Sequence, residues 1–81
     1  MSSGDARLRW QCRRGMRELD ELLGNYLRTA YGHASKSEKA AFRELLTLPD
    51  PELFGYLLGR QVIEDPSLSE IINKIKVLRF Y

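Results

Sequence analysis

Residues 17–31 read RELDELLGNYLRTAY, and this stretch decides the fold. Its apolar residues recur at three- and four-residue spacing, which places Leu19, Leu22, Leu23 and Tyr26 on one stripe of a helix. Acidic residues in the first turn suit the positive end of the helix dipole. A helix with such a stripe must bury it, so the rest of the chain is expected to supply matching apolar surfaces.

The segments around this stretch predict four further helices. Ser35 and Glu38 have the spacing of a capping box, and the Asp-Pro pairs at 50–51 and 65–66 have the form of helix starts. No segment alternates with a period of two, so no strand is expected. The sequence thus predicts an all-α fold: a single small five-helix bundle over residues 6–81, preceded by a flexible N-terminus of residues 1–5. The helices are expected at 6–13 (capped by Asp5), 17–31, 36–48, from a cap at Asp50 to Gly59, and 66–79.

Two small residues in these patterns need an explanation. Gly24 lies inside the strongest helical pattern, where glycine costs about 1 kcal/mol relative to alanine, and we expect a close helix crossing at this position. Cys12 is the only cysteine, so no intramolecular disulfide can form. Its spacing favours an apolar residue on the buried side of a helix, although a thiol among arginines could instead ionise at a lowered pKa.

The composition is that of one small folded domain. The chain has 81 residues, of which 43% are hydrophobic and 30% charged, and its net charge of +2 is too small to identify a partner. No apolar run approaches the roughly 20 residues that a membrane span requires. We therefore expect a cytoplasmic protein without membrane insertion.

Charge is concentrated in residues 13–20, which read RRGMRELD. Three arginines, a glycine and two carboxylates lie between two predicted helices, and Arg9 and Trp10 come just before them. A simple connector needs neither this charge nor this backbone freedom. The asymmetry predicts a basic face at the N-terminal end, suited to an acidic protein surface, a phosphate or a nucleic acid.

Enzymatic chemistry is disfavoured by the residues present. His33 is the only histidine and lacks the partners of a catalytic triad, no Cys/His cluster has metal-ligand spacing, and there is no glycine-rich phosphate loop. We expect no catalytic residue, no metal and no stably bound cofactor. A small nucleic-acid-binding helical domain is an alternative, but the acids of residues 18–21 would repel phosphates, so we expect no nucleic-acid partner.

A protein-docking surface is the third interpretation. Arginine and tryptophan are enriched at binding hot spots, and Gly15 allows close backbone approach because it has no Cβ. Glu18 is expected to orient Arg14 or Arg17 toward a partner. The alternative is a purely structural role, in which Glu18 only caps the helix start and the arginines only keep this surface soluble. The sequence pattern alone does not decide between the docking role and the structural role.

Two motifs make the sequence resemble the succinate dehydrogenase assembly factor family. The first is Arg-Gly-x-x-Glu, here Arg14, Gly15 and Glu18, preceded by RLRW at 7–10. The second is DPELFGYL at residues 50–57, in which Tyr56 stands where many members have tryptophan. The resemblance covers about residues 6–79.

The resemblance implies a five-helix, chaperone-like factor. Such a factor binds the flavoprotein subunit of succinate dehydrogenase, and in some bacteria that of fumarate reductase, and promotes covalent attachment of FAD to a histidine of that subunit. The FAD would belong to the client, and the factor is expected to be a monomer. Some members of the family are labelled as the antitoxin of a toxin–antitoxin pair, and an antitoxin-like interaction module is the second alternative function. The partner-binding residues implied are Arg14, Gly15, Glu18 and Arg17, flanked by Arg13, Arg9 and Trp10.

Overall fold

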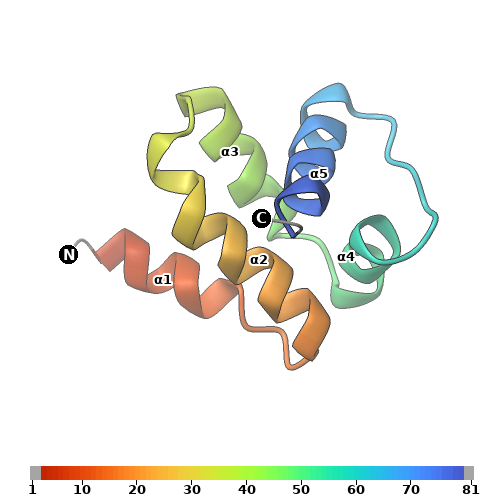
Figure 1. Cartoon of the computed structure of the whole chain (residues 1–81), viewed down its shortest axis with the longest axis horizontal. Helices are drawn as coiled ribbons and strands as arrows, with labels where there is room; N and C mark the ends of the chain where they lie inside the picture. Colours follow the sequence, from red (N-terminus) through yellow and green to blue (C-terminus); the bar gives the residue numbers. More distant parts are fainter. Residues whose placement is uncertain (1–2, 80–81) are drawn as a thin grey trace.

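A computed structural model describes residues 3–79, with side chains from residue 6 onward, and it contains the five predicted helices (Figure 1). No strand occurs within these residues, so the all-α prediction is confirmed. In chain order the elements are α1 (Ser3–Gln11), α2 (Arg17–Thr29), the short 3₁₀ turn η1 (Tyr31–His33), α3 (Lys36–Leu45), α4 (Asp50–Leu57) and α5 (Pro66–Leu78).

The helix boundaries differ from the prediction at several ends. Helix α1 begins at Ser3, so residues 3–5, which were expected to be flexible, are helical and Asp5 lies inside the helix. The expectations for residues 1–2 and 80–81 fall outside the described residues. Helix α3 ends at Leu45 because the chain tightens into 3₁₀-type bonds, such as Leu48 N–H to the Leu45 carbonyl at 3.1 Å, ahead of Pro49.

The predicted helix caps fare differently. The Ser35 hydroxyl accepts the Glu38 backbone N–H at 3.1 Å, and Asp65 accepts two backbone N–H groups at the start of α5, so both residues are confirmed as caps. Only the Ser35 half of the expected capping box forms, because the Glu38 carboxylate bonds to Tyr26 and Lys74. The cap predicted at Asp50 is wrong. Helix α4 already includes Asp50, Pro49 is its N-cap, and the Asp50 carboxylate faces an arginine from another part of the chain.

The core forms where α2, α3 and α5 meet. Helix α5 packs against α2, α3 and α4, while α1 lies on the outer side of α2 (Figure 1). The stripe of residues 17–31 points inward as predicted, and Tyr26 is fully buried against the rings of Phe42 and Tyr31, with centroids 4.6 and 6.4 Å away. The largest fully buried side chains are Tyr26, Phe42, Leu19, Leu23, Leu45, Leu53, Leu57, Ile71 and Ile75.

A network of three polar side chains links three helices beside this core. The Tyr26 hydroxyl donates to Glu38 Oε2 at 2.5 Å, and Lys74 Nζ donates to both Glu38 oxygens at 2.9 Å. Partial burial opposes ionisation of Glu38, but the bonds from Tyr26 and Lys74 outweigh it and lower the pKa of the carboxyl from its usual 4.5. We call these three residues the bundle network, because they join α2, α3 and α5.

Candidate functional site

The arginine–glycine turn lies between α1 and α2. Gly15 has φ of +79°, and it is the only residue in the described chain with a positive φ. This left-handed conformation is strained for residues that carry a Cβ, so glycine is required for the backbone. A Cβ placed there would meet no atom within 4 Å, which means that Gly15 faces open space. The turn is therefore exposed, with a fixed and unusual backbone.

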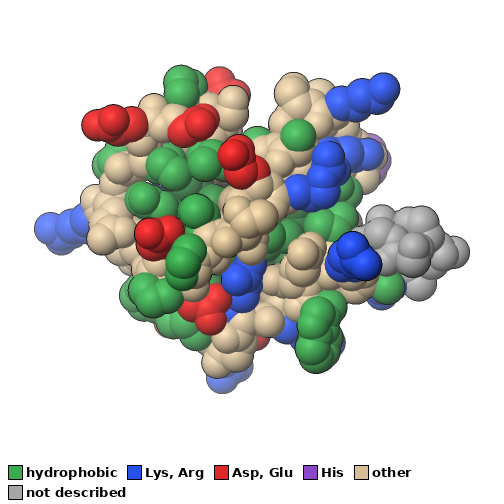
Figure 2. Space-filling view, turned by 180° about the vertical axis from the view of Figure 1, so that it is seen from behind, with side chains coloured by type: hydrophobic (Ala, Val, Ile, Leu, Met, Phe, Trp, Pro, Cys, Tyr) green, Lys and Arg blue, Asp and Glu red, His purple; other side chains and the backbone are tan. Residues whose placement is uncertain are grey.

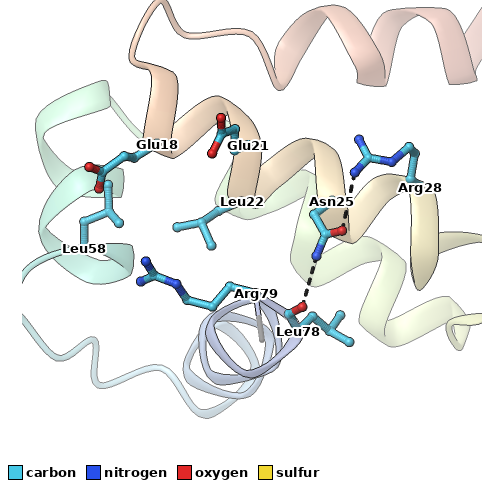
Figure 3. A pocket seen from close by; sticks show the side chains of 8 residues that line it. All are labelled: Glu18, Glu21, Leu22, Asn25, Arg28, Leu58, Leu78 and Arg79. Carbon is cyan, nitrogen blue, oxygen red and sulfur yellow. Dashed lines mark hydrogen bonds between the residues drawn. The ribbon is translucent and has the colours of Figure 1, made fainter. Parts of the chain in front are cut away.

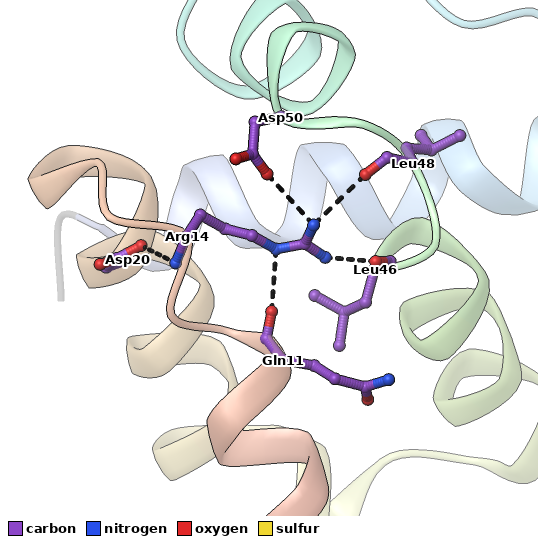
Figure 4. A network of polar contacts seen from close by, with 6 residues as sticks. All are labelled: Gln11, Arg14, Asp20, Leu46, Leu48 and Asp50. Atoms are coloured by element: carbon purple, nitrogen blue, oxygen red, sulfur yellow. Dashed lines mark hydrogen bonds and ion pairs between the residues drawn. The ribbon is translucent and has the colours of Figure 1, made fainter.

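Arg14 points away from this open space. Its guanidinium is surrounded by acceptors from three places: the Gln11 carbonyl at the end of α1, the Leu46 and Leu48 carbonyls after α3, and the Asp50 carboxylate at 3.2 Å (Figure 4). Its side chain is only 16% exposed. We call Arg14 and its partners the turn network, because they fasten the α1–α2 turn to the α3–α4 loop.

Two expectations about these side chains are therefore wrong. Arg14 does not project outward in this structure, because four acceptors within the chain engage its guanidinium. Glu18 does not orient it, and Arg17 instead donates to Glu21 at 3.4 Å, one helical turn further on. That pair is highly exposed and contributes little to stability. A direct contact between Arg14 and a partner protein stays a prediction that no observation here tests.

Glu18 is the exposed carboxylate of the motif. No hydrogen bond or ion pair joins it to another residue within the described part of the chain. It lines a cleft of about 360 Å³ between α2 and the ends of α4 and α5, with Leu22 toward the floor and Leu58 beside it (Figure 3). Arg79 reaches toward the same cleft from the end of α5. Glu18 is thus placed to accept a hydrogen bond from outside the chain.

The flanking residues of the motif lie on the surface. Trp10 is 74% exposed and the Arg17 side chain 91% exposed. Arg9 on α1 and Arg13 in the turn after α1 are also exposed, and both line a groove between α1 and α2. On the back of the molecule, basic side chains gather toward the N-terminal half, and acidic ones gather over the half that carries α4 and α5 (Figure 2).

Two aspartates in the turn network were missed by the sequence reasoning. Asp20 was interpreted as a dipole partner of its helix, but its carboxylate accepts the Arg14 backbone N–H at 2.6 Å and closes the turn. Asp50 was interpreted as a cap, but it pairs with the Arg14 guanidinium. The available signal was the joint occurrence of the two motifs: the first residue of one motif binds the first residue of the other.

Other candidate chemistry finds little support in the described residues. Cys12 is 3% exposed, and burial raises the pKa of its thiol to about 11. The interpretation of Cys12 as a thiolate with a lowered pKa is therefore wrong, and its role as a buried apolar residue is confirmed. Residues 3–79 contain no group of His, Cys, Asp or Glu that could hold a metal ion. None of the described helices is long and apolar enough to cross a membrane.

Fold and turn together define a class: a small helical protein whose exposed features are a charged turn and shallow clefts. Residues 6–79 match the family described as "Flavinator of succinate dehydrogenase", and the chain belongs to this family. The resemblance inferred from the two motifs is confirmed.

Curated relatives agree with this assignment. The chain is 50% identical to the FAD assembly factor SdhE of Idiomarina loihiensis over 67 residues, which is 83% of this chain and 74% of the relative. It is 46% identical to that of Methylococcus capsulatus over 72 residues, covering 89% and 87% of the two chains. For the Shewanella oneidensis protein the identity is 41% over 71 residues, covering 88% and 87%.

Proposed function

We propose that this chain binds the flavoprotein subunit of succinate dehydrogenase and promotes covalent attachment of FAD to it. The single observation that carries the proposal is the position of the family's motif: Gly15 in the α1–α2 turn and Glu18 at the start of α2 are both exposed, and the Glu18 side chain has no partner within the described chain. Family membership over residues 6–79 supports the client and the cofactor. Fumarate reductase flavoprotein is the second client that we would test.

The proposed mechanism needs no nucleophile from this chain. A factor that prefers the client conformer in which histidine and flavin are aligned shifts the client's population toward that conformer. Alignment of two reacting groups can lower a barrier by several kcal/mol, up to about 7–11 kcal/mol in ideal cases. The FAD belongs to the client, and we propose that this chain acts in the cytoplasm as a monomer without catalysing a step itself.

Each motif residue has a distinct role in this proposal. Gly15 lets the client approach the turn backbone, and Glu18 accepts a hydrogen bond or ion pair from the client. Arg17, Arg13, Arg9 and Trp10 surround this contact. Arg14 fixes the position of the turn through its bonds to Asp50 and the α3–α4 loop. This modifies the expectation from sequence, in which Arg14 itself contacts the client.

Flavinylation in a co-expressed client tests the role of Glu18. In a host without its own factor, Glu18→Gln should lower covalent flavin, measured by in-gel fluorescence of the denatured subunit, about tenfold or more, because the neutral amide loses the charge that strengthens the bond from the client's donor. Glu44→Gln is the matched control, since Glu44 is an exposed carboxylate on α3. Equal fluorescence in both variants would remove Glu18 from the proposal.

A pair of Gly15 variants tests the approach to the turn. Gly15→Ala and Gly15→Arg impose the same left-handed strain, but only arginine adds bulk to the open space above the turn. Both should keep near-native helicity by circular dichroism, and only Gly15→Arg should abolish binding to the purified flavoprotein. If Gly15→Ala abolishes binding equally, client binding depends on the backbone conformation at residue 15 and not on open space above the turn.

The antitoxin alternative finds no support in the comparisons. The nucleic-acid alternative has a simple test, because phosphate contacts make affinity fall steeply with salt. We expect no salt-sensitive binding of the purified chain to duplex DNA.

A further inference from the structure

A groove separates α1 from α2 on the side away from the Glu18 cleft. Its volume is about 730 Å³, compared with about 360 Å³ for that cleft. Arg9 on α1 and Arg13 just after α1 form one wall, Gly24 and Leu27 lie along the α2 wall, and the groove ends at η1. Helix α1 therefore leaves part of the neighbouring surface of α2 uncovered.

Gly24 is the unusual residue in this groove. The close helix crossing expected from the sequence is not found: a Cβ at this position would meet only the tip of Arg28, at 3.8 Å, which is an ordinary contact. The described fold therefore does not require glycine here. The bare backbone at mid-helix lets another polypeptide approach α2 more closely than it could over any side chain.

The charges of the groove select the kind of polypeptide. Both acids on its wall have partners within the chain, since Asp20 accepts from the Arg14 backbone and Glu21 from Arg17. Two of the groove's arginines, Arg13 and Arg28, are less satisfied. Arg28 donates only to the neutral amide oxygen of Asn25, at 3.4 Å, and within residues 6–79 no carboxylate pairs with Arg13 or Arg28. Among the described residues, Arg13 and Arg28 thus lack a carboxylate partner, and they lie beside the apolar wall of the groove.

We infer that this groove binds an acidic, amphipathic segment of the flavoprotein client. An apolar side chain of that segment packs over Gly24 and Leu27, and its carboxylates pair with Arg13 and Arg28. The inference rests on the proposed function and extends it to a second contact. Glu21 and Arg28 line both the groove and the Glu18 cleft, so one client that straddles α2 covers both surfaces.

Calorimetric titration of the purified flavoprotein with groove variants tests this inference. Gly24→Gln fills the groove with a helix-compatible side chain, and the double variant Arg13→Glu/Arg28→Glu reverses its charge. Each should weaken binding about tenfold or more, with helicity unchanged by circular dichroism. Arg60→Glu is the matched control for the charge reversal and should bind within about threefold of the original chain, since Arg60 is an exposed arginine on the α4–α5 loop.

The outcomes separate the two proposals. If the unmodified chain binds and both groove variants bind equally well, the groove inference is overturned while the proposed function stands. If the unmodified chain does not bind the flavoprotein, the proposed function fails and the groove inference falls with it. Sedimentation equilibrium of the chain alone gives a further check: a dimer that Gly24→Gln abolishes would make a second copy the occupant, and would overturn an acidic client segment.

Discussion

The turn network and the bundle network are built from similar groups but differ in what lies above them. Each joins segments far apart in sequence through a charged side chain, Arg14 in one and Glu38 in the other. Arg14 holds an exposed turn with a left-handed glycine, next to Glu18, whose carboxylate has no partner among the described residues, whereas Glu38 supports only the contact of α2 with α3 and α5. The comparison teaches that an ion network indicates function through the surface it holds in place, and not by itself.

Removing Arg14 should have the largest effect on stability. Arg14→Ala leaves the Leu46 and Leu48 carbonyls and the Asp50 carboxylate without their donor, and water reaches them only in part. We expect a loss of about 2–3 kcal/mol in the free energy of unfolding, measured by urea denaturation. Arg17→Ala is the control, with a change below about 0.5 kcal/mol. Equal effects of the two variants would mean that the turn network does not hold the turn.

Neutralising Glu38 should have the next largest effect. Glu38→Gln weakens the bonds from Lys74 and Tyr26, and we expect a loss of about 1–2 kcal/mol at neutral pH. Folding lowers the pKa of Glu38 below 4.5, so its stabilisation is complete above that pH and is lost as the pH falls through the lower folded value. The gap between original and variant chains should therefore close in acid. A gap that persists at low pH would contradict this assignment.

A methyl group on α2 should raise stability. Gly24→Ala touches neither network and meets only an ordinary contact with Arg28, so it should gain about 0.5–1 kcal/mol from helix propensity. Thermal unfolding measures the gain as a higher Tm. A loss would mean that some element of the chain crosses Gly24 after all.

The sequence predicted most of the fold because helix periodicity and capping are local. Leu19, Leu22 and Tyr26 lie where their spacing placed them, and the Ser35 and Asp65 caps formed. Contacts between segments far apart in the sequence were harder to predict. The bond between Arg14 and Asp50 joins residues 36 positions apart, and helical spacing alone gives no sign of it. The direction of Arg14 was mistaken for that reason.

Of the variants considered, Glu18→Gln should give the smallest change in stability. It also sharpens most the comparison between the residue that holds the turn and the surface above it. No partner within the described chain is lost in Glu18→Gln, and the first turn of α2 still holds Asp20, so we expect a change below about 0.5 kcal/mol. Urea denaturation beside Arg14→Ala checks this directly. A large loss would mean that Glu18 supports the fold, and its effect on flavinylation would then not show contact with a client. A small loss, combined with lost flavinylation, would separate the residue that meets the client from the residue that holds the turn.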